Sequence, residues 1–275
     1  KYEKEIKDKQ KELVNQQKEL AKVNAQKRMQ DAADEIAELR RREQERRAND
    51  GNGSYTLDDS TKNAIDNAVS KMIGAMNNAD ADSIIAQFEA LKEALPSGDN
   101  PEENAYAAQK LSEMAQALYD RAQKETDPVK KAQLLAKAKE YADEAALRDP
   151  SNKNAQTLSN NLTDRVASAR KDGQNATNSA VNDALKEATS TNKSADDVLN
   201  AFDEAYKSIP KGDNPEDNAF ASKKLTEMAQ ALYDRAQKEN DTIKKVQLLS
   251  KAKEYAEEAT KRDFSNEKAL NLLQL

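Results

Sequence analysis

The segment 49–59 places oxygen-bearing side chains at alternate positions, which is the spacing of a calcium-binding loop. Five residues would supply ligands at positions 1, 3, 5, 7 and 9 of such a loop, the fourth through its backbone oxygen: Asp50, Asn52, Ser54, Thr56 and Asp58. Tyr55, however, stands where the sharp turn requires Gly, and Thr61 replaces the bidentate Glu. These departures favour the alternative, a flexible turn rich in Asn, Asp and Gly.

A second candidate site occurs twice. The stretch EMAQALYDRAQKE appears at 113–125 and again at 227–239, each time with a tyrosine two residues before an arginine. Tyr and Arg are the residue types that most often anchor protein interfaces. We therefore predict a peptide-binding groove lined by Tyr119, Arg121, Tyr233 and Arg235. Two alternatives remain open: the tyrosines belong to an Ala-rich core, or a recent duplication preserved them without a role.

Other catalytic chemistry has little support in the sequence. The chain contains no Cys, His or Trp, which removes thiol nucleophiles, zinc sites and imidazole acid–base catalysis. Adjacent carboxylates such as Glu102/Glu103 and Glu257/Glu258 would suit glycosidase-like chemistry, but they fall on predicted polar faces without an aromatic platform for a sugar. We expect a protein that is not an enzyme and needs no cofactor.

Charge is unevenly distributed. Residues 1–48 carry 14 Lys/Arg against 11 Asp/Glu, which leaves 30 against 39 for the rest of the chain. Arginines at 40–42 and 46–47 would suit an acidic lipid or a phosphate, but interleaved glutamates favour pairing within a helix. Because the repeats are acidic, we expect no nucleic-acid partner.

The elements that position these residues come from a tandem duplication. Residues 99–152 return as 213–266, always 114 residues later, with roughly three quarters of the paired positions identical. An internal copy this close indicates a repeat array, and arrays of helical units build long surfaces that hold other molecules. The composition, 37% hydrophobic and 34% charged with six Gly and six Pro, is typical of an all-α fold.

Residues 1–48 lack Gly and Pro and are predicted to form one long helix. In its first apolar stripe, Ile6, Leu13 and Leu20 lie seven residues apart, and Tyr2 and Val23 flank them. A second stripe follows in a shifted phase: Met29, Ala33, Ile36 and Leu39. This pattern favours a short parallel coiled coil that oligomerises the protein or spaces it from a membrane. The alternatives are a solvated helix or one packed on its own repeats.

After a linker at 49–59, we predict two helical-repeat units, 60–173 and 174–275, with Gly173 closing the first. Asn100 and Asp127 each precede a Pro that can occupy the first helical position. The predicted helices run to about 77, 95, 124, 148 and 171 in the first unit, and cover about 176–189, 195–208, 216–239, 242–262 and 265–274 in the second. Ala-rich stripes on the third and fourth helices predict closely packed antiparallel pairs and a solenoid-like array.

The ending of this helix pair, AKEYADEAALRDPSNKNA, resembles the second helix and junction of a tetratricopeptide repeat. Alanines match the family's small packing positions in both copies: Ala138, Ala145, Ala252 and Ala259. Pro150 matches its closing proline, which Phe264 replaces in the second copy. The first-helix pattern departs, without a Trp-Leu-Gly start, and the period is 114 rather than 34. The resemblance covers about 100–155 and 214–269 and implies tetratricopeptide-like helical hairpins.

A coiled coil followed by such repeats is similar in layout to the periplasmic cell-division coordinator family of bacteria, which works through protein contacts. That similarity and the lack of Cys favour a bacterial cell-envelope setting. No apolar stretch approaches the roughly 20 residues of a membrane span, and because the chain begins at Lys1, an upstream signal or anchor is compatible with it. We expect a scaffold or adaptor with a protein or peptide partner, or alternatively a self-assembling surface-layer or appendage component.

Overall fold

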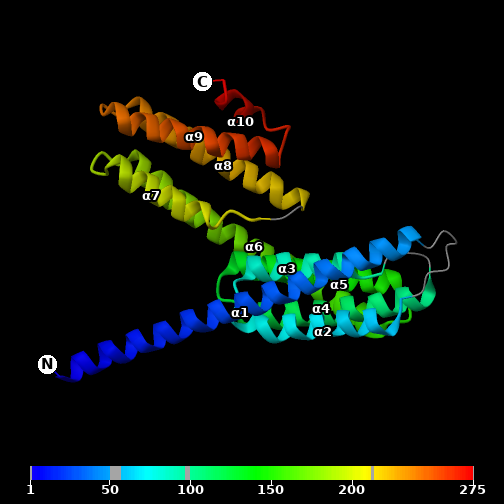
Figure 1. Ribbon diagram of the computed structural model, residues 1–275. Coiled ribbons are helices and arrows are strands. Elements are labelled where there is room, and N and C mark those ends of the chain that lie inside the picture. Colours follow the sequence, from blue (N-terminus) through cyan, green and yellow to red (C-terminus); the bar gives the residue numbers. More distant parts are fainter. Residues whose placement is uncertain (1, 50–56, 97–99, 212–213, 275) are drawn as a thin grey trace. The chain divides into compact units, whose positions relative to one another are not determined.

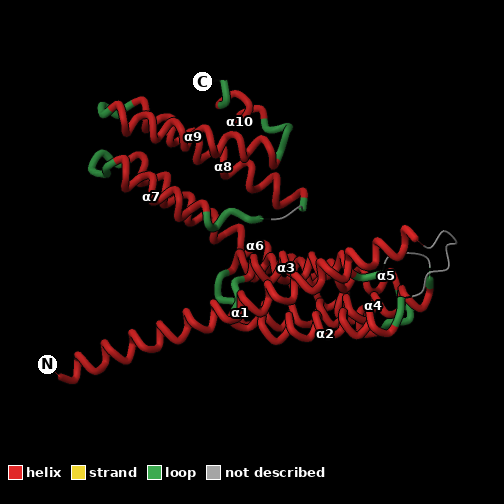
Figure 2. Tube along the Cα trace, viewed as in Figure 1, coloured by secondary structure: helices red, strands yellow, loops and turns green. Residues whose placement is uncertain are grey.

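The computed structural model describes residues 2–49, 57–96, 100–211 and 214–274. Every regular element in those ranges is a helix (Figures 1 and 2), which confirms the all-α prediction. The elements, in order, are α1 Tyr2–Asn49, α2 Asp59–Ala75, a 3₁₀ helix Met76–Asn78, α3 Ala81–Ala94, α4 Pro101–Lys124, α5 Pro128–Arg148, α6 Lys153–Thr189, α7 Ala195–Tyr206, α8 Pro215–Gln237, α9 Thr242–Arg262 and α10 Glu267–Leu272. None of the described helices is long and apolar enough to cross a membrane.

The starts of the duplicated helices follow from local capping chemistry. The Asn100 side chain accepts a hydrogen bond from the backbone N–H of Glu102 at 3.0 Å, directly before Pro101 at the first helical position. Asn214 does the same for Glu216 at 2.9 Å. An Asn cap accepts hydrogen bonds from backbone N–H groups that have no partner at a helix start. A Pro at the first helical position loses no hydrogen bond, because the N–H that it lacks would have no partner within the helix. The helix starts predicted from Asn100-Pro101 and Asp127-Pro128 are confirmed, because α4 begins at Pro101 and α5 at Pro128.

One compact unit, here called unit 1, comprises residues 1–125 and 134–166. Within it, the second half of α1 packs on α2 and α3, and it buries Ala25, Ala32 and Ile36 to 5% exposure or less. These residues are seven and four positions apart, which is helical spacing, so they form one face. Packing on its own repeats, one of the alternatives for the long helix, therefore holds for this stretch. Of the predicted second stripe, Ile36 belongs to this buried face and Ala33 is half-buried.

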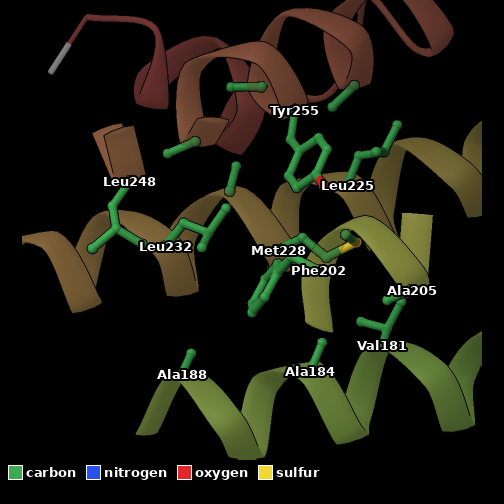
Figure 3. Close-up of a cluster of buried hydrophobic side chains, with 14 of the residues drawn as sticks. Val181, Ala184, Ala188, Phe202, Ala205, Leu225, Met228, Leu232, Leu248 and Tyr255 are labelled. Atoms are coloured by element: carbon green, nitrogen blue, oxygen red, sulfur yellow. The ribbon is translucent and has the colours of Figure 1, made fainter. Parts of the chain in front are cut away.

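The other compact unit, unit 2, comprises residues 126–133 and 167–275. Its core is contributed by α6, α7, α8, α9 and α10, with Phe202 of α7 lying beside Met228 of α8 and over the alanines of α6 (Figure 3). The helices α8 and α9 form a packed pair.

The Ala-rich stripes predicted for α4 and α5 are buried, apart from the half-buried Tyr106: Leu111, Met114, Ala115, Leu118, Ala122, Leu135, Ala138, Tyr141, Ala142 and Ala145.

The predicted break at Gly173 is wrong. Helix α6 runs without interruption from Lys153 to Thr189, so the fifth helix of the first repeat and the first helix of the second are one helix. Gly173 is buried inside it against the start of α5, where an added Cβ would lie 3.3 Å from the carbonyl oxygen of Pro128. The glycine therefore permits a close approach of two helices and does not end one.

Candidate interaction surfaces

The structure places both tyrosines of the predicted peptide groove in half-buried positions. The Arg165 guanidinium lies over the ring of Tyr119, with 5.5 Å from its central carbon to the ring centroid. Tyr233 packs against the buried apolar cluster of unit 2. Both rings thus contribute to packing while keeping part of their surface in solvent, which is compatible with the core alternative and with an interface.

Arg121 and Arg235 make equivalent intramolecular contacts. Arg121 of α4 donates to the backbone oxygen of Ala79 at 3.4 Å and pairs with Glu125 at 2.9 Å. Arg235 of α8 repeats this 114 residues later. It donates to the backbone oxygen of Lys193 at 3.2 Å and pairs with Glu239 at 3.2 Å. Each guanidinium ties its helix to the residues just before α3 or α7. Partner binding by the four residues stays a prediction.

Replacing Arg235 with methionine is expected to lower the free energy of unfolding by about 1 kcal/mol, because one carbonyl and one carboxylate lose a charged donor. Arg121→Met is expected to cost a similar amount. Chemical denaturation checks both, with the exposed Lys238→Met as the control. A loss no larger than the control's would show that these contacts do not hold the helices together.

A second arginine contact also recurs at a spacing of 114 residues. Arg148 donates to the backbone oxygen of Pro96 at 2.6 Å and pairs with Glu144 at 2.8 Å. Arg262 donates to the backbone oxygen of Pro210 at 2.9 Å and pairs with Glu258 at 3.0 Å. Sequence analysis missed these contacts. The available signal was that each arginine and its glutamate partner, four residues earlier, is retained in both copies.

The two copies differ where a side chain of α3 or α7 meets these carboxylates. In unit 1, Lys92 pairs with Glu144 at 2.6 Å, and although burial opposes the shift, Lys92 and Arg148 lower the pKa of this carboxyl. In unit 2, Tyr206 occupies the equivalent position and donates to Glu258 at 2.5 Å. Burial and this hydrogen bond raise the pKa of Tyr206 to about 12. A cation–carboxylate contact has been exchanged for a neutral donor.

The predicted calcium loop cannot be assembled from described residues. Asp50, Asn52, Ser54 and Thr56 lie outside the described ranges. Asp58 is described, and its carboxylate accepts from the backbone N–H of Thr61 at 2.7 Å, which makes it the N-cap of α2. Within the described part of the chain, no group of three or more Asp or Glu side chains is placed to hold a metal ion.

The carboxylate pairs weighed as catalytic candidates have structural partners. Glu103 is buried and accepts a hydrogen bond from the backbone N–H of Leu57 at 2.7 Å, so it anchors the segment that leads into α2. Glu258 pairs with Arg262, as above. In the basic cluster, Arg41 pairs with Glu38 and Glu45 within α1, as predicted for these interleaved charges.

A groove of about 500 Å³ lies between α6 and α7 in unit 2. Alanines from both helices form its floor: Ala180, Ala184, Ala201 and Ala205. Charged residues line it as well, four of them carboxylates and one an ammonium: Asp183, Glu187, Asp197, Glu204 and Lys193. Lys193 pairs with Glu187 at 2.9 Å. An apolar floor with a polar rim is the usual anatomy of a binding surface.

The repeat identifies the counterpart of this groove in unit 1. The sequence alignment of the copies, with a two-residue gap, matches α6 beyond Gly173 with α2, and α7 with α3. In unit 1 that face is covered, because α1 packs on both α2 and α3. Lys71 of α2 pairs there with Glu35 of α1 at 2.6 Å. In unit 2 the residue matching Lys71 is Glu187, so the charge is reversed.

Comparison with known proteins does not assign the chain to a family. No protein-family model matches it, and neither does any curated protein. The structure supports an all-helical protein whose antiparallel helix pairs pack in sequence, and the groove is one candidate surface on it.

Proposed function

We propose that the protein is a non-enzymatic scaffold or adaptor. It holds a helical segment of a protein partner in the α6–α7 groove, while α1 oligomerises or tethers it. The tetratricopeptide-like character of the helix pairs and their solenoid-like succession belong to the same proposal. One observation carries it: α6 and α7 form this groove in unit 2, whereas in unit 1 helix α1 packs on their counterparts α2 and α3.

The floor of the groove defines the shape of the partner. Side chains as short as those of Ala184 and Ala201 let a third helix approach closely, as the alanines of α1 do in unit 1. A helix lying in a groove is recognised through apolar anchors at spacings of three, four and seven residues. The partner segment is therefore an amphipathic helix with one apolar stripe.

The rim of the groove defines the partner's charge. The lining residues include four carboxylates and one ammonium, and Glu187 stands where unit 1 has Lys71. A helix seated like α1 would bring its residue at the Glu35 position next to Glu187. Complementary charge across an interface selects partners and speeds association. We expect a basic helix with Lys or Arg at that position.

A peptide derived from α1 itself tests the groove. The probe spans residues 22–42 and carries Glu35→Lys, and the matched control is the same peptide with Glu35. Fluorescence anisotropy is expected to show saturable binding of the probe that exceeds binding of the control. The double variant Glu187→Lys/Glu204→Lys is expected to weaken probe binding by about tenfold or more, which corresponds to 1.4 kcal/mol.

The exposed Glu257→Lys is the matched charge control, because it makes the same change on α9 outside the groove lining. It should leave probe binding within twofold of the unaltered protein. Equal binding of both peptides, or a loss as large with Glu257→Lys, would refute specific seating in the groove.

A second candidate function is structural self-assembly. It is favoured by large apolar side chains that remain exposed on α1 and on α9, in helices that belong to different units. Exposed apolar side chains that recur on one helix face mark association surfaces more often than isolated ones do.

A further inference from the structure

Helix α9 carries two large apolar side chains that are mostly in solvent. Ile243 is 70% exposed and Val246 is 60% exposed. They lie one turn apart on one face of the helix and are here called the α9 strip. Isolated exposed apolar residues are ordinary, so the pair by itself decides nothing. The residues at the equivalent positions of the other copy, however, are covered.

The equivalent residues of α5 are covered by a helix. Val129 matches Ile243 and is 6% exposed, and Ala132, which matches Val246, is half-buried. Both lie against α6 at Gly173, where an added Cβ would be 3.4 Å from the Cα of Val129 and 3.6 Å from the Cβ of Ala132. This face of the repeat is therefore built to take a helix.

The α9 strip carries larger apolar side chains than its covered counterpart on α5. Between the copies, Val129 becomes the larger Ile243 and Ala132 becomes the larger Val246. The α6–α7 groove differs in both senses, with Glu204 in place of Ala90 and Ala201 in place of Gln87. Transient interfaces are the more polar class, whereas stable interfaces bury more apolar area. The α9 strip follows the second pattern.

Helix α1 offers a matching surface. Leu13, Leu20 and Val23 are 57–61% exposed, at spacings of seven and three residues, and are here called the α1 stripe. The intramolecular packing of α1 described above involves a different face, which begins at Ala25. In a helix, residues 9–23 extend about 22 Å, whereas the 21 residues of α9 extend about 31 Å. The stripe can therefore lie along α9.

We propose that the α1 stripe of one copy packs on the α9 strip of a second copy. The charges agree with this pairing: Glu12 and Glu19 each precede a leucine of the stripe, and Lys253 follows Val246 by seven residues on the same face of α9. Because two different surfaces meet, the contact is heterologous and repeats from copy to copy into open chains. The inference deepens the self-assembly candidate above and is independent of the groove.

Two complementary variants test the pairing by sedimentation velocity. One carries Leu13→Glu/Leu20→Glu and the other Ile243→Glu/Val246→Glu. The unaltered chain is expected to give a mass that grows with concentration. Each variant alone is expected to remain at the monomer mass of 30.5 kDa. An equimolar mixture retains one intact pair of surfaces and is expected to form a capped dimer of twice that mass.

Three results would overturn the inference. A variant altered only on α9 that still dimerises would mean that α1 pairs with α1 in a parallel coiled coil. An equimolar mixture that stays monomeric would mean that the two surfaces do not meet. An unaltered chain that stays monomeric at every concentration would exclude a second copy as the occupant.

The control for adding charge at an exposed leucine is Leu147→Lys. Leu147 is 81% exposed, and the repeat has lysine, Lys261, at the equivalent position, so the substitution is compatible with the fold. It should assemble like the unaltered chain, and circular dichroism should show full helicity for every variant. Glu187→Lys/Glu204→Lys should also assemble normally, which separates failure of this inference from failure of the groove.

Discussion

Gly173→Leu is expected to lower the free energy of unfolding by about 2–3 kcal/mol, as overpacking of a tight interior does. Gly173 lies inside α6, and the atoms nearest to an added Cβ are the carbonyl oxygen of Pro128 and the Cα of Val129, at 3.3 and 3.4 Å. Both are backbone atoms, which cannot rotate away as a flexible side chain does. The first turn of α5 would have to move. Urea unfolding followed by circular dichroism measures the change.

Gly74→Ala is the matched control. Gly74 lies inside α2, and an added Cβ would meet nothing within 4 Å. Alanine there is expected to raise the free energy of unfolding by about 0.5–1 kcal/mol, because glycine is the less favourable helix residue. If Gly173→Leu proved as harmless as Gly74→Ala, the close approach of α6 to α5 would not exist in solution.

The failure at Gly173 shows where local rules stop. Glycine after a helical stretch usually ends the helix, so the sequence alone favoured a break there. The reason for this glycine is the backbone of Pro128 and Val129, more than 40 residues earlier in the chain. Such a neighbour is invisible to any local pattern. By contrast, the starts of α4 and α8 depend only on Asn100, Asn214 and the prolines that follow, and they were predictable.

The candidate interaction residues show the same limit of local sequence patterns. The Tyr-Arg pairs were conspicuous because they are copied, but the acceptors of Arg121 and Arg235 are backbone oxygens 42 residues away in sequence. Side-chain type and spacing do not encode such acceptors. The groove was missed entirely, although a signal existed. The first half of each repeat has diverged far more than the second, with Lys71 replaced by Glu187, and this is what two differently covered faces would produce.

Long helices raise a related difficulty. The two stripes of α1 were predicted to be out of phase, but the sequence did not show which face of the helix is buried within the chain. Ala32 and Ile36 are almost fully buried, whereas Leu13 and Leu20, which are more apolar than alanine, are exposed. Ala32 is thus buried while two leucines are exposed, although leucine is the more apolar residue. Which face of α1 is covered within the chain depends on α2 and α3, which are formed by later sequence.

Phe202→Ala is expected to cost about 3–5 kcal/mol, the range for removing a fully buried aromatic ring. Phe202 has no exposed surface and lies among side chains of α6 and α8 in the core of unit 2 (Figure 3). Its repeat counterpart Phe88 is equally buried in unit 1, so Phe88→Ala should cost a similar amount. Chemical denaturation measures both losses.

Hydrogen exchange followed by mass spectrometry then distinguishes the two changes by position. Because each ring packs within its own unit, Phe202→Ala should accelerate amide exchange most in α7 and α8, and Phe88→Ala most in α3 and α4. The control is Phe264→Ala, where the ring is 81% exposed and the expected loss is within about 0.5 kcal/mol. Acceleration spread evenly over both units by either core variant would mean that they open as one cooperative body. A loss at Phe202 no larger than at Phe264 would contradict the core itself.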